Sequence, residues 1–124
     1  MVCAGAFYDV DIAISWHLYS FWEVAPALSL ANTRADFSFT GRAAHASAAP
    51  HLGRSALDAL ELMSVGVNYM REHMPSDARV HSVIFDTGGI APYVAQAHVR
   101  IRYAIRAMKL QDMKDSLHRG HMIT

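Results

Sequence analysis

The sequence predicts an α+β fold in which an antiparallel sheet carries two helices on one face. Residues 95–106 alternate between apolar and polar side chains, which is typical of a strand with one buried face. Residues 52–73 carry apolar side chains at three- and four-residue steps, the period of an amphipathic helix. Two more strand-like segments and a second, shorter helix-like segment complete the pattern.

The composition is that of a globular chain and excludes several classes of function. Apolar residues make up 52% and charged residues 18% of the 124 residues, which argues against disorder. Eleven basic and eleven acidic side chains cancel, so no overall field would attract nucleic acid or an anionic membrane. No apolar run approaches the roughly 20 residues that a membrane span needs. A lone cysteine, Cys3, excludes an internal disulfide and fits a reducing, cytoplasmic setting.

The first predicted elements are short. Residues 10–16 form an apolar run that ends at His17 and predicts a buried strand. Residues 18–31 are also apolar but contain Pro26, which favours a connector or a broken strand.

A half-buried strand and a long helix are predicted next. In residues 34–40, Phe37 and Phe39 point to one side and polar residues to the other, and Gly41 stops the strand. The helix over residues 52–73 would make about six turns. Its apolar stripe consists of Leu52, Ala56, Leu60, Met63, Val67 and Met70.

The remaining elements are two strands and a helix. Residues 79–86 are rich in β-branched and aromatic side chains and predict a strand, followed by a hairpin turn at Gly88 and Gly89. The alternating strand at 95–106 comes next, and then a helix over residues 109–118. The expected buried positions are Ala95, Ala97, Val99, Ile101, Tyr103 and Ile105 on the strand and Leu110, Met113 and Leu117 on the helix.

From residue 34 onward the predicted order is strand, helix, strand, strand, helix. This order matches a ferredoxin-like split βαβ fold that lacks its last strand. A missing strand would leave a sheet edge unpaired, which favours aggregation. The sequence therefore predicts a truncated domain.

Several motifs in the chain resemble those of one enzyme family, the dinuclear-zinc aminoacylase and carboxypeptidase-G-like peptidases. The motifs are Phe39-Thr40-Gly41 with His45, the segment 50–56, the turn at 86–89, the strand with Arg106, and the upstream segment 10–17. The resemblance is to the dimerisation (lid) domain of these enzymes. It implies that residues 1–31 are the end of a catalytic-domain segment with its connector, and that residues 32–124 are a truncated lid.

The resemblance also implies an activity that this chain does not complete. Family members cleave N-acyl or N-aroyl amino acids such as p-aminobenzoyl-glutamate, with water activated by two zinc ions and a glutamate as general base. The family's other ligand motifs and its glutamate have no counterpart here. We therefore expect the chain alone to be inactive and to bind neither zinc nor manganese tightly.

Three partners follow from the resemblance, and two other functions stay open. The partners are a second copy of the chain, joined through the sheet edge and a helix, the rest of the catalytic domain, and a small acyl-amino acid. Neither nucleic acid nor a membrane is expected. The alternatives are a dimerisation module without chemistry and a gene remnant without a selected function.

Five residues take roles from the resemblance. His45 matches the lid histidine that crosses to the partner's active site and stabilises the oxyanion there. His17 matches a zinc ligand, and Arg106 matches an arginine that grips a substrate carboxylate. Gly89 and Tyr93 fall in the substrate-binding segment, where the family usually carries asparagine at the position of Tyr93.

Four of these five residues also have a simpler interpretation. His45 would be a cap or surface residue, and His17 a buried histidine bonded to backbone. Arg106 would belong to a solvated strand face that it shares with two other arginines. Gly89 would serve turn geometry alone. No two histidines have the i, i+4 spacing of a helical zinc site.

Overall fold

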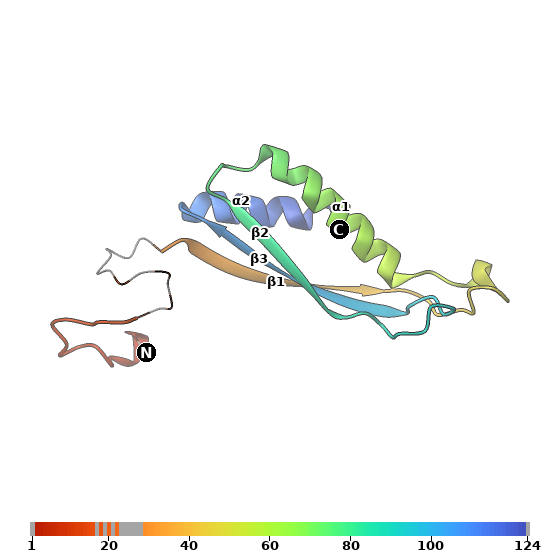
Figure 1. The fold of residues 1–124 in the computed structure, drawn as a ribbon, viewed down its shortest axis with the longest axis horizontal. Coiled ribbons are helices and arrows are strands. Elements are labelled where there is room, and N and C mark those ends of the chain that lie inside the picture. Colours follow the sequence, from red (N-terminus) through yellow and green to blue (C-terminus); the bar gives the residue numbers. More distant parts are fainter. Residues whose placement is uncertain (1, 17, 19, 21, 23–28, 124) are drawn as a thin grey trace.

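The computed structural model describes residues 2–16, 18, 20, 22 and 29–123. In this part the chain forms three strands and two α-helices, arranged as an extended sheet with both helices on one face (Figure 1). The predicted α+β class is confirmed. In chain order the elements are η1 (Val2–Ala4), β1 (Ala31–Thr40), η2 (Pro50–Leu52), α1 (Ala56–Met70), η3 (Arg71–His73), β2 (Arg79–Asp86), β3 (His98–Ala107) and α2 (Leu110–His121), where η marks a 3₁₀ turn.

The sheet is antiparallel with the strand order β1-β3-β2. β3 is central: it pairs with β1 from Ala31↔Ala107 to Thr40↔His98 and with β2 on its other side. Since both outer strands run against β3, β1 and β2 are parallel to each other and need the α1 crossover between them. In the described part of the chain, β1 and β2 are therefore the two edges of the sheet.

The core lies between the helices and one face of the sheet. The alternation expected for this strand is confirmed from Val99 onward, because Val99, Ile101, Tyr103 and Ile105 are each at most 3% exposed. The first two positions expected to be buried are not, since Ala95 is half-buried and Ala97 is exposed. Tyr103 is buried with its hydroxyl 3.2 Å from the Ser64 hydroxyl, so its polar atom has a partner. Every apolar position expected on the long helix is buried except the first, namely Ala56, Leu60, Met63, Val67 and Met70.

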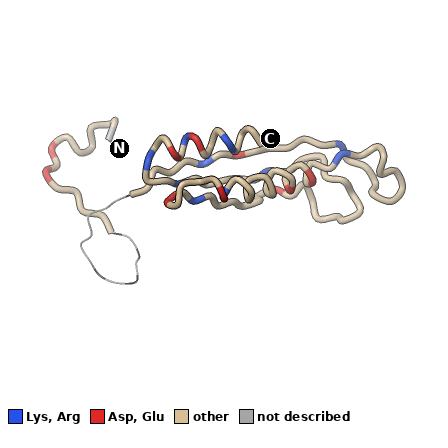
Figure 2. The backbone as a smooth tube through the Cα atoms, turned by 90° about the horizontal axis from the view of Figure 1, so that it is seen from above, with Lys and Arg blue, Asp and Glu red and all other residues tan. Residues whose placement is uncertain are grey.

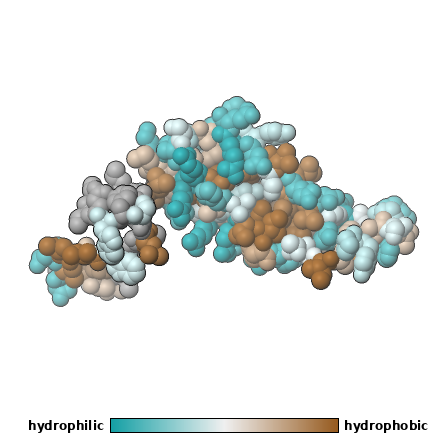
Figure 3. All heavy atoms as spheres, viewed as in Figure 1, coloured by the Kyte–Doolittle hydropathy of each residue, from teal (hydrophilic) through white to brown (hydrophobic). Residues whose placement is uncertain are grey.

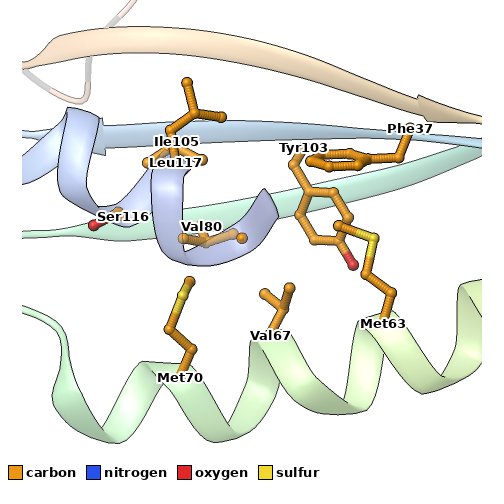
Figure 4. Close-up of a pocket in the computed structure, with 10 residues that line it drawn as sticks. Phe37, Met63, Val67, Met70, Val80, Tyr103, Ile105, Ser116 and Leu117 are labelled. Carbon is orange, nitrogen blue, oxygen red and sulfur yellow. The ribbon is translucent and has the colours of Figure 1, made fainter. Parts of the chain in front are cut away.

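A small apolar pocket of about 10 Å³ remains between the two helices and the sheet (Figure 4). Phe37, Met63 and Leu117 are among the side chains that line it, and Phe37 meets Tyr103 edge-on at 5.9 Å. Its volume is at the lower limit for one water molecule. The pocket is therefore a packing defect of the core and has no room for a substrate.

The long helix begins later than the sequence predicts. α1 starts at Ala56, capped by Ser55, and Leu52 lies in the preceding 3₁₀ turn with 48% of its surface exposed. The reason is that Arg54 exchanges two backbone hydrogen bonds with Arg42, at 2.7 and 2.8 Å. A residue held extended in this way cannot take part in a helix, so the prediction of a start at Leu52 is wrong.

The strand β3 also begins later than predicted, at His98 instead of Ala95. The N–H of Ala95 donates to Ala44, and the carbonyls of Gln96 and Ala97 accept hydrogen bonds from residues outside the sheet. These backbone groups are therefore already used by another part of the chain. By contrast, the strand predicted at 79–86 is confirmed at both ends.

The connection between β2 and β3 is a long loop, residues 87–97, and not a tight hairpin turn. Gly88 and Gly89 do adopt the positive φ expected of them, at 72° and 126°. A Cβ at Gly88 would overlap the carbonyl oxygen of His98, so glycine is needed there on two grounds.

In α2, which begins at Leu110, the predicted stripe is only partly confirmed. Met113 is buried and Leu117 packs against the core, but Leu110 is 55% exposed. Leu110 is the first residue of the helix, at the point where the chain leaves the sheet. No helix in the described part of the chain is long and apolar enough to cross a membrane.

The strand predicted over residues 10–16 is wrong. These residues form no strand, and Ile12, Ile14 and Trp16 are 78%, 92% and 87% exposed. A strand needs a neighbour for its backbone groups, and no described strand pairs with this segment. His17 and most of the predicted connector at 18–31 lie outside the described residues.

Candidate functional site

The candidate site is a loop structure at one end of the sheet, beyond Thr40 and His98. Residues 41–56 and 87–97 extend past the strands there and lie side by side (Figure 1). We call these two segments the His45 corner. Six backbone hydrogen bonds of 2.7–3.0 Å hold the corner together, from the N–H of Gly41 to Ala97, of Arg42 to Arg54, of Arg54 to Arg42, of Ala56 to Gln96, of Ala95 to Ala44 and of Ala46 to Tyr93.

Gly41 is where three backbone segments of the corner meet. A Cβ at this position would overlap the carbonyl oxygen of Arg54 and would lie 2.7 Å from the nitrogen of Ala56 and 2.8 Å from the oxygen of Gln96. All three atoms belong to hydrogen-bonded backbone and cannot move aside cheaply. The sequence motif around Gly41 therefore has a steric cause, since only glycine fits.

His45 lies in the corner at a bridge to Val94, with its side chain exposed. Its Nδ1 accepts hydrogen bonds from the backbone N–H of Ser47 at 3.3 Å and of Ala48 at 3.2 Å. The Ser47 hydroxyl is a further 3.2 Å neighbour of Nδ1. Sequence reasoning missed Ser47, although serine is one of the residues that are common in turns.

Tyr93 is brought next to His45. The two rings are roughly parallel, with their centroids 6.1 Å apart and their planes 27° apart. Tyr93 keeps 59% of its surface exposed, so a flat aromatic face is presented beside the imidazole. Two of the sequence-predicted site residues thus lie together in space although they are far apart in the chain.

The corner has few charges. Between Arg42 and Arg54, and throughout residues 87–97, there is no lysine, arginine, aspartate or glutamate. Figure 2 shows the tips of these loops in tan for this reason. His45 consequently has no carboxylate partner inside the corner, and the arrangement differs from a histidine–carboxylate pair.

Gly89 lies in the same loop but has a different character. Its φ of 126° is accessible to glycine and strained for other residues. Its carbonyl accepts from the Thr87 hydroxyl at 3.1 Å, and no heavy atom would lie within 4 Å of a Cβ added there. These contacts support the turn interpretation of Gly89.

Arg106 is not brought to the corner. On β3 it lies eight residues beyond His98, opposite Asn32 and Arg79, near the other end of the sheet. Eight residues of strand span about 27 Å. Among the described residues, the Arg106 guanidinium makes no hydrogen bond or ion pair, so it is free to bind an anion.

The open face of the sheet carries an ion pair that the sequence did not single out. Arg102 donates to both carboxylate oxygens of Asp36, at 2.6 and 2.7 Å, and Arg100 and Arg102 lie over the Phe85 ring. The hydrogen bond from Arg102 and its charge hold the pKa of the Asp36 carboxyl below its ordinary value of 3.8. The pair orders the middle of this face, away from the corner.

The described residues offer no metal site. No three histidine, cysteine, aspartate or glutamate side chains among them are grouped so as to hold an ion. His17, the predicted zinc ligand, is outside the described residues. The zinc or manganese implied by the resemblance therefore has no ligand set in this part of the chain.

Comparison with known proteins identifies relatives over most of the chain. No model of a known protein family matches it. It is 47% identical over 114 residues to a subunit of the p-aminobenzoyl-glutamate hydrolase of Escherichia coli, which covers 92% of this chain and 24% of that protein. It is 29% identical over 114 residues to mouse Xaa-Arg dipeptidase, covering 92% of this chain and 26% of that protein. The chain thus spans about a quarter of the length of these relatives.

Solved structures share the fold. The aminobenzoyl-glutamate utilization protein of Klebsiella pneumoniae superimposes with a TM-score of 0.64 at 22% identity, covering 77% of this chain and 24% of that one. Aminopeptidase PepT of Bacillus cereus superimposes with a TM-score of 0.57 at 22% identity, covering 76% of this chain and 25% of that one. At these identities the likeness concerns the fold alone.

Proposed function

The chain belongs to the aminoacylase and carboxypeptidase-G-like family of metal-dependent peptidases and amidohydrolases, within the region of its dimerisation domain, and from this premise we propose that it is the lid part of an amidohydrolase. Its substrates are N-acyl or N-aroyl amino acids, with p-aminobenzoyl-glutamate first among them. The observation that carries the proposal is the 47% identity to the E. coli p-aminobenzoyl-glutamate hydrolase over 92% of the chain.

His45 serves a catalytic centre that another chain completes. The corner extends beyond the sheet, so its histidine can reach outside its own fold (Figure 1). The strand between His98 and Arg106 alone is about 27 Å long. Because a small acyl-amino acid cannot span that distance, His45 and Arg106 would contact one substrate only if they come from different chains.

Tyr93 and Arg106 are assigned to the substrate, and Gly89 to the substrate-binding loop that carries Tyr93. The exposed Tyr93 ring suits an aromatic acyl group, which it would meet face to face beside His45. The Arg106 guanidinium, which has no partner among the described residues, suits the carboxylate of the amino acid. Gly89 holds the loop before Tyr93 in a conformation that other residues reach only with strain.

A second copy of the chain would join through β2 and α1. β2 is an edge strand, and its Val83, Ile84 and Phe85 are 57%, 43% and 44% exposed. Figure 3 shows apolar surface gathered on the middle of the molecule. α1 adds a stripe of exposed apolar side chains at helical spacing, Leu62, Val65 and Tyr69.

Two other elements of the proposal lie outside the described residues. A fourth strand beside β1 would complete the ferredoxin-like fold. The general base and the other metal ligands would belong to the rest of a catalytic domain, and His17 of this chain would supply one ligand.

A dimerisation module without chemistry is the second candidate function. The exposed apolar strand edge and helix stripe favour it, because they would join two copies whether or not a catalytic domain is present. Light scattering tests this part: we expect a dimer, and Leu62→Asp with Tyr69→Asp should give a monomer. Met108→Asp, at an exposed position outside the stripe, is the control, and a monomeric wild-type chain contradicts the interface.

The catalytic proposal is tested with a chimera. This chain replaces the aligned 114 residues of the E. coli hydrolase, and hydrolysis of p-aminobenzoyl-glutamate is measured with the other components of that enzyme present. We expect activity, and a loss of about 10²–10³-fold in kcat for His45→Ala. His51→Ala, an exposed histidine of the same loop, should change kcat less than about twofold. An equal loss in both variants, or none in either, contradicts the role of His45.

The same chimera tests the substrate residues. Tyr93→Ala should raise KM for p-aminobenzoyl-glutamate several-fold, and less for a substrate with an aliphatic acyl group. Arg106→Met should raise KM for both. The chain alone, supplied with zinc and p-aminobenzoyl-glutamate, should give no turnover above the blank; turnover that disappears in His45→Ala would overturn that expectation.

A further inference from the structure

The side chain of His45 has one nitrogen inside the turn and one outside it. Nδ1 faces the backbone N–H groups of Ser47 and Ala48, both of which can only donate. An atom that accepts two N–H donors carries no proton of its own. In the neutral ring the proton must then be on Nε2, for which no partner exists among the described residues.

The turn that creates this environment is closed independently of the ring. The N–H of Ala49 donates to the backbone oxygen of His45 at 3.0 Å, and the N–H of Ala46 donates to Tyr93 at 2.8 Å. These bonds keep the backbone N–H groups of Ser47 and Ala48 directed at the ring. The Ser47 hydroxyl, 3.2 Å from Nδ1, can add a third donor.

We propose that the turn from His45 to Ala49 is a tautomer lock that makes His45 a hydrogen-bond donor through Nε2. The only lone pair of the neutral ring is taken up inside the turn, so His45 can neither remove a proton from water nor bind a metal through Nδ1. Its ligand is an acceptor oxygen, either a carbonyl or an oxyanion. Ser47 and Ala48 are positioning residues, and only the identity of that oxygen as a scissile carbonyl rests on the function proposed above.

The surroundings of the ring agree with this role. Besides His45, the ionisable side chains of the corner are Arg42, Arg54, His51 and Tyr93. None of them is a carboxylate, which could accept a hydrogen bond from Nδ1 and so favour a proton there. Another histidine shows the opposite hydrogen-bonding arrangement. His121 directs Nδ1 at the carbonyl oxygen of Leu117 at 3.0 Å, which requires the opposite tautomer in a neutral ring.

Nitrogen NMR of the ¹⁵N-histidine-labelled chain reads the tautomers directly. At a pH of about 8, well above the ordinary histidine pKa of about 6.5, His45 should carry its proton on Nε2 alone. His121 should carry its proton on Nδ1. His51 makes no side-chain hydrogen bond in the described part of the chain, so it should show the mixture of both tautomers that is expected of an unconstrained ring. A His45 signal that matches the His51 mixture, or that places the proton on Nδ1, overturns the proposal.

Hydrogen exchange tests whether the ring and the turn depend on each other. In His45→Ala the amides of Ser47 and Ala48 should exchange about fivefold to tenfold faster. The exchange rate of the Ala49 amide should not change, since this amide donates to the backbone oxygen of residue 45. His45→Asn should restore the protection, because its side-chain oxygen can accept the same two donors. Unchanged exchange at residues 47 and 48 in His45→Ala contradicts the lock.

The variant Ser47→Ala separates the contribution of the Ser47 hydroxyl from that of the backbone N–H groups. This variant keeps both N–H donors, so His45 should still carry its proton on Nε2 alone. A mixed tautomer in Ser47→Ala would show that the backbone does not hold the ring and would overturn the proposal. None of these measurements involves catalysis, so an inactive chimera would count against the proposed function and leave the lock standing.

Discussion

Beneath α1 and α2 the sheet is held by side chains, whereas the His45 corner is held by its backbone. Leu60, Val99 and Ile101 are each at most 2% exposed under the helices. In the corner most side chains are small or exposed, and six backbone hydrogen bonds hold it together. Four of them join segments that are more than 35 positions apart in the sequence, and the other two join Arg42 to Arg54. The first arrangement depends on apolar volume. The second depends on where N–H and C=O groups point, which suits a region that must hold one imidazole in a fixed orientation.

The largest effect is expected from removing core volume. Leu60→Ala should lower the free energy of unfolding by about 3 kcal/mol, because it leaves a cavity between α1 and the sheet. Leu52→Ala in the corner, where the same side chain is 48% exposed, should cost less than about 1 kcal/mol. Urea unfolding of both variants measures the difference. Equal losses would mean that the corner is packed like the core.

A smaller loss of stability is expected from Gly41→Ala, at about 2 kcal/mol. The added methyl group would overlap the backbone around Arg54 and force the corner open. We expect the amides of Arg42 and Arg54 to lose protection from hydrogen exchange while the core amides keep theirs. If protection is lost evenly over the whole chain, the corner is not a separate unit of stability.

Gly120→Ala should act in the opposite direction and stabilise the chain by about 0.5–1 kcal/mol. The residue is in α2, where glycine is a poor helix former, and no heavy atom lies within 4 Å of an added Cβ. The new methyl group would also reduce the apolar pocket that Gly120 lines. A rise in the urea midpoint at unchanged slope would confirm it, and a fall would show that the pocket cannot take the methyl group.

The smallest effect is expected from the exposed ion pair on the open face. Since the folded-state pKa of Asp36 lies below 3.8, its pair with Arg102 stabilises the fold above that pH and loses its contribution as the pH falls through the folded-state pKa. Wild type and Asp36→Asn should therefore differ at neutral pH and converge in acid. Unfolding measured from pH 7 to pH 2 tests this. A constant difference would mean that the carboxylate charge has no part in it.

Much of the fold could be predicted because its strands and helices carry their own pattern. The alternation at Val99, Ile101 and Tyr103 determines which face of β3 is buried, and the stripe from Ala56 to Met70 determines the buried side of α1. These patterns depend on the period of the backbone, which is a local property. The element order was predictable for the same reason.

The errors lie where a distant segment competes for the same backbone. Arg54 continues the helical pattern but bonds to Arg42, and Ala95 continues the strand pattern but bonds to Ala44. Residues 10–16 have the composition of a strand but no neighbour among the described strands. In each case the local pattern is real, and a partner far away in the sequence, or its absence from the described part of the chain, decided the outcome.

The sequence by itself determined the α+β class, the buried faces of β3 and α1 and the turn at Gly88 and Gly89, and its resemblance to a known family singled out His45. It could do so because periodicity and steric limits act within a few residues. Only the tertiary structure decided that Tyr93 lies beside His45, that Arg106 is at the opposite end of the sheet, and that Nδ1 of His45 is occupied. Those facts depend on register between strands and on backbone directions across the corner, which no local pattern contains.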